Sequence, residues 1–274
     1  MSKLVSLLNE NTKIVVDVDL GGRITEFSLN GKNALAEQGI QVGSTFWPSP
    51  QSTWDWPPLT ALDSDAYQLE SESDSCVQMI SSVCESTQLQ LRKIISKTGR
   101  GFDVTYELIN RSRKPVKYAP WEISRVYGGL TLFESSQPIL DNSNLTVDHI
   151  QDHYWFDYVP AGLENNLKLF ANHSEGWIAN VFNGLLYLKT FPKIDQDLIA
   201  PNEAEVEVYA HGDPDNAYIE IEQQGAYVEI QAGSSIKWTV GWSLYSLPGG
   251  VASQESLVGS QALLDFIHAN LAKT

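Results

Sequence analysis

A segment from Tyr118 to Tyr127 places tryptophan, glutamate and arginine inside an apolar run. It reads Tyr-Ala-Pro-Trp-Glu-Ile-Ser-Arg-Val-Tyr and follows a strand-like run from Phe102 to Asn110. Aromatic faces, carboxylates and guanidinium groups are common components of sites that bind polar small molecules. We therefore take Trp121, Glu122 and Arg125 as candidate site residues. The alternative interpretation is a structural Glu–Arg pair beside a core tryptophan.

A second set of candidates alternates along a predicted strand nearer the C-terminus. Tyr218, Glu220 and Glu222 stand at positions i, i+2 and i+4, so their side chains share one face of that strand. Such a face can simply be solvated. It can also present a carboxylate to a ligand as a general base.

The segment from Val42 to Pro58 holds three tryptophans and four prolines. Prolines at this density disfavour a helix or a central strand, and tryptophans are unfavourable in water. We therefore expect an ordered loop that either lines a pocket or closes one end of a β-sandwich. Its candidate sugar contacts are Trp47, Gln51, Trp54 and Trp56.

The elements that must position these residues are mostly strands. Ile14, Val16, Val18 and Leu20 alternate with polar residues, and Asn30-Gly31 is a strong hairpin signal. Similar short strands separated by polar turns continue to about residue 246, which predicts an all-β chain of large antiparallel sheets. Only the tail is expected to be helical, over about 252–272 with Ser253 as N-cap. No linker divides the chain, so we expect one domain over 1–274.

Composition excludes several classes of function. The 274 residues carry a formal net charge of -16, which disfavours nucleic acid and anionic membrane surfaces as partners. We find no signal peptide and no apolar run near the roughly 18 residues of a membrane span. The two cysteines, Cys76 and Cys84, form no CxxC motif. The sequence thus predicts a cytoplasmic protein with free thiols, and without a metal signature, phosphate loop or nucleophile elbow it predicts no metal and no cofactor.

Three stretches of the chain form a recognisable set. They are Leu20-Gly-Gly-Arg-Ile-Thr-Glu-Phe-Ser-Leu-Asn-Gly, Thr105-Tyr-Glu-Leu-Ile-Asn-Arg-Ser, and the Glu222 strand with its glycine turn at Ala232-Gly233. Together they resemble the galactose mutarotase-like (aldose 1-epimerase) superfamily. The segment Gly43 to Gln51 is also similar to the family's segment ahead of its first substrate-binding arginine. The resemblance implies a β-supersandwich, a small-molecule carbohydrate as partner, and a glutamate as general base. Glu222 fits the spacing slightly better than Glu220.

The chain departs from the family pattern at the general acid. Where mutarotases carry a histidine, this chain reads Ala119-Pro-Trp-Glu. The acid would then be Glu122, or one of the histidines His149, His153, His173 and His211. Three functions follow as alternatives: an aldose 1-epimerase-type isomerase, a non-catalytic carbohydrate-binding protein, or a glycan hydrolase or lyase in which Glu122 and Glu222 flank the bond.

Overall fold

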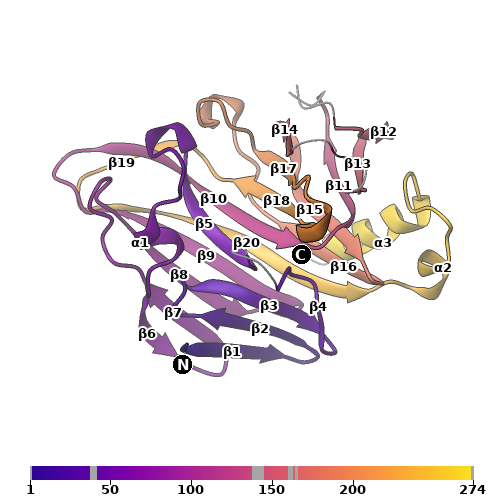
Figure 1. The fold of residues 1–274 in the computed structure, drawn as a ribbon, viewed down its shortest axis with the longest axis horizontal. Coiled ribbons are helices and arrows are strands. Elements are labelled where there is room, and N and C mark those ends of the chain that lie inside the picture. Colours follow the sequence, from indigo (N-terminus) through magenta and orange to yellow (C-terminus); the bar gives the residue numbers. More distant parts are fainter. Residues whose placement is uncertain (1, 38–41, 138–144, 160–162, 164–165, 273–274) are drawn as a thin grey trace.

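The computed structural model describes residues 2–37, 42–137, 145–159, 163 and 166–272. Within these residues the strands form two antiparallel sheets of ten strands each (Figure 1). One continuous apolar cluster contains residues of both sheets, such as Phe27 and Ile221 from the first and Tyr106 and Trp242 from the second. The two sheets therefore pack face to face, and the predicted all-β class is confirmed.

The first sheet has the order β1-β2-β3-β5-β10-β18-β17-β14, with β4 beside β3 and β19 beside β10. Its strands are β1 Leu4–Asn9, β2 Thr12–Asp17, β3 Arg23–Leu29, β4 Lys32–Asn33, β5 Ser44–Ser49, β10 Val116–Val126, β14 Leu167–Ala171, β17 Val206–Ala210, β18 Ile219–Gln224 and β19 Val228–Ile230.

The second sheet has the order β12-β13-β11-β15-β16-β20-β9-β8-β7-β6. Its strands are β6 Gln68–Glu72, β7 Cys76–Ile80, β8 Leu89–Lys97, β9 Gly101–Asn110, β11 Gly129–Ser135, β12 Asp148–Ile150, β13 His153–Tyr158, β15 Ser174–Phe182, β16 Leu185–Thr190 and β20 Ser235–Ser246.

Strand β10 lies at the centre of the first sheet, as expected for the segment that holds Trp121 and Arg125. It pairs with β5 on one side and with β18 and β19 on the other. Successive side chains of a strand point to opposite faces. Glu122 therefore points between the sheets, toward Lys189 of β16, whereas Trp121 and Arg125 point to the outer face of the first sheet.

The prediction of a loop over Val42 to Pro58 is wrong for its first part, because Ser44–Ser49 forms the buried strand β5. Two features let this strand tolerate its proline. Pro48 lies opposite Pro120 of β10, and β5 pairs with β3 at Ser44 alone. Beyond Ser44 the strand therefore has an edge-like side where no backbone donor is needed. The remainder is irregular, with a 3-10 turn at Gln51–Thr53.

The predicted C-terminal helix is present, but it begins later than the expected residue 252. The tail holds two helices, α2 Gly249–Ala252 and α3 Gln261–Leu271, in addition to the short α1 Thr60–Asp63. Ser253 ends α2, and the N-cap of α3 is Ser260, whose hydroxyl accepts a hydrogen bond from the Leu263 N–H at 3.2 Å. Gly259, at φ +72°, makes the turn that separates the helices.

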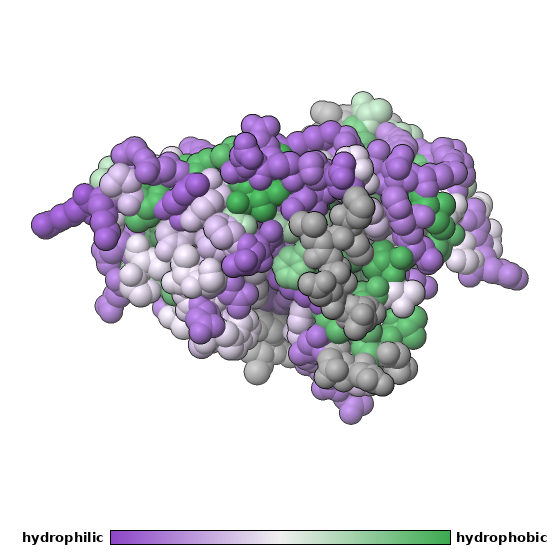
Figure 2. Space-filling view, turned by 90° about the horizontal axis from the view of Figure 1, so that it is seen from above, coloured by the Kyte–Doolittle hydropathy of each residue, from purple (hydrophilic) through white to green (hydrophobic). Residues whose placement is uncertain are grey.

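The face in Figure 2 is largely hydrophilic, with hydrophobic residues gathered in smaller patches between the polar ones. Among the helices of the described residues, none has the length and apolar character to cross a membrane.

Candidate functional site

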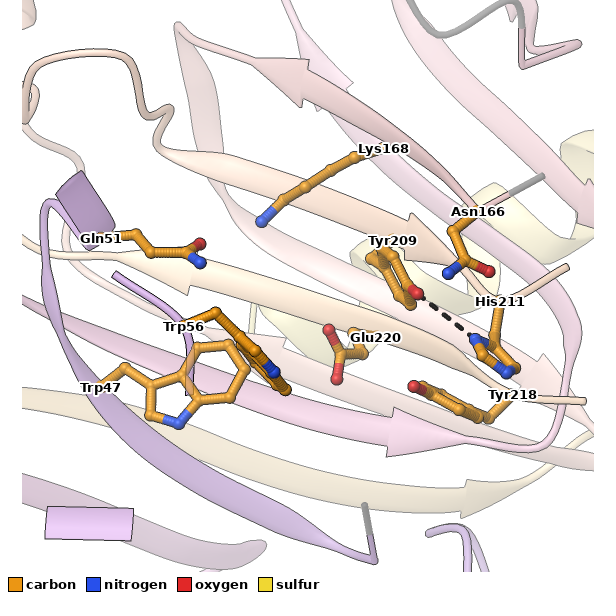
Figure 3. Close-up of a pocket in the computed structure, with 9 residues that line it drawn as sticks. All are labelled: Trp47, Gln51, Trp56, Asn166, Lys168, Tyr209, His211, Tyr218 and Glu220. Carbon is orange, nitrogen blue, oxygen red and sulfur yellow. Dashed lines mark hydrogen bonds between the residues drawn. The ribbon is translucent and has the colours of Figure 1, made fainter. Parts of the chain in front are cut away.

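A cavity of about 450 Å³ lies on the outer face of the first sheet (Figure 3). Strands β5, β14, β17 and β18 each contribute one side chain, and neighbouring loops contribute the rest. The lining residues are Trp47, Gln51, Trp56, Asn166, Lys168, Tyr209, His211, Tyr218 and Glu220. This volume lies within the usual range for small-molecule sites, and aromatic side chains with a few polar groups are the usual lining.

Strand pairing brings the polar groups together. Glu220 of β18 lies opposite Arg125 of β10 on one side and opposite Tyr209 of β17 on the other. Residues directly opposite in neighbouring strands share a face. The predicted alignment of Glu220 with Glu222 therefore holds, and Glu222 lies opposite Glu207.

Glu220 is held by a buried ion pair. Its Oε1 accepts a hydrogen bond from the Arg125 Nε at 2.7 Å, and the Arg125 side chain has no exposed surface. The Arg125 guanidinium also lies over the Trp47 ring, 5.5 Å from its centroid. In the described part of the chain, Nη1 and Nη2 of Arg125 have no hydrogen-bond partner. Both nitrogens are buried and Arg125 does not line the cavity, so the predicted direct contact of Arg125 with a sugar needs correction, and Arg125 contacts the cavity lining through Glu220 and Trp47.

A second charged cluster lies beside this pair, in which Glu207 and Glu222 are fully buried and the Lys168 side chain is 24% exposed. The Lys168 Nζ is 3.2 Å from Glu222 Oε2 and 2.5 Å from Glu207 Oε2. Burial raises the pKa of Glu222 to about 8, against the opposing effect of Lys168, and raises the pKa of Glu207 to about 7. Burial acts to lower the pKa of Lys168, but the two carboxylates outweigh it and raise that pKa. Lys168 is therefore charged, while the carboxylates share protons near neutral pH.

His211 stands at the far end of the cavity from the tryptophans (Figure 3). Its ring stacks on Tyr218 with centroids 4.6 Å apart, and its Nδ1 is 3.2 Å from the Tyr209 hydroxyl. Burial and the Glu220 carboxylate raise the pKa of Tyr209 to about 12, so this hydroxyl keeps its proton and can donate a hydrogen bond to Nδ1. The imidazole would then carry its own proton on Nε2.

The tryptophans form an aromatic cluster around Trp47. Its ring is edge-on to Trp121, Trp54 and Trp56, at centroid distances of 5.2, 6.0 and 6.1 Å. The Trp47 Nε1–H donates to Asp63 Oδ1 at 2.9 Å, which fixes the orientation of the ring. Trp121 is completely buried and Trp56 is 57% exposed. Trp47 and Trp56 therefore line the cavity, whereas Trp121 and Trp54 pack against Trp47 and do not line it.

Comparisons with solved structures identify the fold of this chain. No protein-family model matches the sequence, and no curated protein matches it. The Slr1438 protein from Synechocystis sp. PCC 6803 superposes with a TM-score of 0.66 at 12% identity, over 90% of this chain and 96% of that one. A galactose mutarotase-like protein from Lactobacillus casei ATCC 334 gives 0.64 at 12%, over 89% and 100%. The chain has the galactose mutarotase-like fold.

A galactose mutarotase related enzyme from Lactobacillus acidophilus shows the same likeness, with a TM-score of 0.63 at 7% identity over 90% of this chain and 99% of that one. The resemblance in the opening hairpin, the Asn110 strand and the Glu222 strand therefore identified the fold correctly. Sequence identities of 7–12% support a shared fold and nothing further. The chemistry of this chain has to be argued from its own side chains.

Three sequence predictions for the site need correction. Glu122 does not reach the cavity, because it lies on the opposite face of the sheet, 2.6 Å from the Lys189 Nζ and 2.9 Å from the Tyr106 hydroxyl. Glu122 and Glu222 consequently face opposite sides of one sheet and cannot flank a glycosidic bond. Glu222 itself is completely buried beside Lys168 and does not line the cavity.

The four candidate histidines differ in their position relative to the cavity. Of the four that could replace the family acid, only His211 lines the cavity. His149 and His173 are exposed, and His153 is buried in the second sheet.

Lys168, Asn166 and Tyr209 line the cavity but were missed from sequence. A signal was present for two of them. Lys168 stands between two leucines in β14, and Glu207 and Tyr209 alternate with apolar residues in β17. The same period-2 pattern singled out Glu220. Asn166 lies in a loop and offered no such signal.

Proposed function

We propose that this chain is an aldose 1-epimerase-type isomerase, acting on a small free sugar, with Glu220 as the general base and His211 as the general acid. Interconversion of sugar anomers requires a base that takes the proton from the anomeric hydroxyl and an acid that protonates the ring oxygen. The observation that carries the proposal is the presence of one carboxylate and one imidazole in the same aromatic cavity.

The contacts of both groups support these roles. Arg125 holds one oxygen of Glu220 and so orients the carboxylate, while the other oxygen is left for a ligand hydroxyl. Tyr209 can donate to Nδ1 of His211, which leaves a proton on Nε2 for the ring oxygen. The rings of Trp47 and Trp56 supply an apolar surface for one face of the sugar.

The proposal is tested by anomer exchange, followed by NMR on a panel of free aldoses. We expect the wild-type protein to accelerate exchange for at least one sugar. Glu220→Gln should lower that rate by about 100-fold or more, and His211→Asn by a similar factor, because each removes one proton-transfer group. Glu229→Gln changes an exposed carboxylate of β19 and should leave the rate unchanged. Unaltered rates in both site variants, or no acceleration of any aldose, would reject the proposal.

A non-catalytic carbohydrate-binding protein is the second candidate. The Glu220–Arg125 pair favours it, because a fixed carboxylate–guanidinium pair is also well suited to holding sugar hydroxyls without proton transfer. Binding with line broadening but without faster exchange would identify this function.

Trp56→Ala is expected to weaken sugar binding under either function. Stacking a sugar on the exposed Trp56 face removes apolar surface from water, worth roughly 1–1.5 kcal/mol, so the dissociation constant should rise about tenfold. Titration followed by chemical shifts of the sugar measures this change. Trp177→Phe, on the other sheet, should leave the affinity as in the wild type.

The two cysteines are unpaired thiols, which supports a cytoplasmic site of action.

A further inference from the structure

Three potential metal ligands from distant parts of the chain meet on the outer face of the second sheet. They are Glu134 of β11, His153 of β13 and His268 of α3, and their ligand atoms all lie within 4.8 Å of one another. Glu134 and His153 are opposite residues of paired strands. The Glu134 Oε2 is 3.8 Å from the His153 Nε2 and 4.0 Å from the His268 Nε2. These residues lie outside the sugar cavity, which is on the first sheet.

His153 is already oriented as a ligand. Its Nδ1 contacts the backbone carbonyl of Gln151, and a carbonyl can only accept, so the proton is on Nδ1. This leaves the lone pair on Nε2. That nitrogen is buried and has no hydrogen-bond partner among the described residues. An imidazole fixed through its other nitrogen by a carbonyl is the usual outer contact of a metal-binding histidine.

Packing places the two imidazoles around the same point. The Trp177 ring lies 5.8 Å from the His153 ring and 6.2 Å from the His268 ring, measured between centroids. Trp177 belongs to an apolar cluster that also contains Leu263 and Ile267 of α3. The helix is therefore docked in the position that brings His268, in its last turn, toward Glu134.

We propose that Glu134, His153 and His268 form a Zn²⁺ site that joins α3 to the second sheet. Two imidazoles and one carboxylate are a common ligand set for Zn²⁺, with a fourth position for water. Bond lengths of about 2.0–2.2 Å put tetrahedral ligand atoms about 3.3–3.5 Å apart. The Glu134 oxygen therefore needs to approach each imidazole by roughly half an ångström, and the two imidazoles, whose ligand atoms lie within 4.8 Å, need to approach each other by about 1.4 Å at most. His268 and Glu134 can make this movement, because their side chains are 47% and 32% exposed.

The test uses the full chain without an affinity tag. Co²⁺ should give the visible absorption of a four-coordinate ion, and equimolar Zn²⁺ should abolish it. Zn²⁺ at about a hundredfold excess over its dissociation constant should raise the melting temperature by roughly 5 °C. His268→Ala should weaken Zn²⁺ binding about 100-fold. His149→Ala removes an exposed imidazole outside the cluster and should bind Zn²⁺ as the wild type does.

Glu134→Gln provides a second variant that keeps the side-chain shape and removes the charged ligand. It should also weaken Zn²⁺ binding, without a change in sugar binding. The absence of Co²⁺ absorption and of a Zn²⁺-dependent melting shift would overturn the proposal and leave the cluster as a set of ion pairs. Binding that persists unchanged in both His268→Ala and Glu134→Gln would overturn it equally.

Discussion

Replacing Glu122 with leucine is expected to lower the free energy of unfolding by about 3–5 kcal/mol. The carboxylate is 2.6 Å from the Lys189 Nζ, and both side chains have no exposed surface. Leucine fills the space but leaves an ammonium group between the sheets without its counter-charge. Burial already lowers the pKa of Lys189, so the unpaired lysine should lose its proton in the folded variant.

Urea unfolding followed by tryptophan fluorescence measures this loss. The double variant Glu122→Leu with Lys189→Met should recover much of it, because removing both charges also removes the cost of burying them. Lys13 and Glu26 form a matched Lys–Glu pair on the surface, with side chains 42% and 28% exposed. Glu26→Gln should therefore change stability by about 0–1 kcal/mol. A Glu122→Leu variant as stable as Glu26→Gln would contradict the structural role assigned to Glu122.

Stability is expected to fall as the pH rises from about 5 to 7. A carboxyl group whose pKa is higher in the folded than in the unfolded chain binds its proton more tightly when folded. Such a group stabilises the folded chain at low pH, and this stabilisation is lost progressively as the pH rises from the unfolded to the folded pKa. Burial raises the pKa of Glu222 from 4.5 to about 8 and that of Glu207 from 4.5 to about 7. Burial raises the pKa of the neighbouring Glu203 as well.

Each of these protons contributes up to about 1.4 kcal/mol per pH unit, so the total over this range is on the order of 3–5 kcal/mol. Above pH 7 the effect should be partly offset by Lys93, because burial lowers its pKa to about 7 and its contribution has the opposite sign. Chemical unfolding at several pH values gives the slope, and Glu222→Gln should reduce it. An equal slope in Glu222→Gln and wild type would show that this cluster does not control the pH dependence, and Glu229→Gln is the surface control.

The strand pattern allowed much of the fold to be predicted from sequence. Alternation around Ile219 and Ile221 identified one apolar and one polar face of β18, and both faces are present in the sheet. Similar alternation at Ile14 and Val16 predicted β2, and the family resemblance supplied the sandwich architecture. The start of the tail helix was misread because Ser253 and Ser260 are both N-cap residue types, whereas Ser253 ends α2 and only Ser260 begins α3.

The candidate site was predicted less completely, for a geometric reason. Trp121, Glu122 and Arg125 are close in sequence, but a strand sends Glu122 to the opposite face from the other two. The spacing of these residues was enough to predict that Glu122 faces away from Trp121 and Arg125. It was not enough to predict which face lines the cavity, because that depends on where the second sheet packs. Convergence of Lys168, His211 and Glu220 depends on the pairing of β14, β17 and β18, and no local pattern contains that information.

The two-sided character of β10 also bears on how errors in folding are avoided. A one-residue slip of this strand against β18 would move Arg125 between the sheets and expose Glu122 on the outer face. The slipped chain would separate Glu122 from Lys189 and Arg125 from Glu220, leaving four charged groups without their native partners. A misaligned pairing at the centre of the sheet is therefore energetically unfavourable. The Glu122–Lys189 and Arg125–Glu220 pairs thus favour the native register of β10 as well as positioning Glu220 in the cavity.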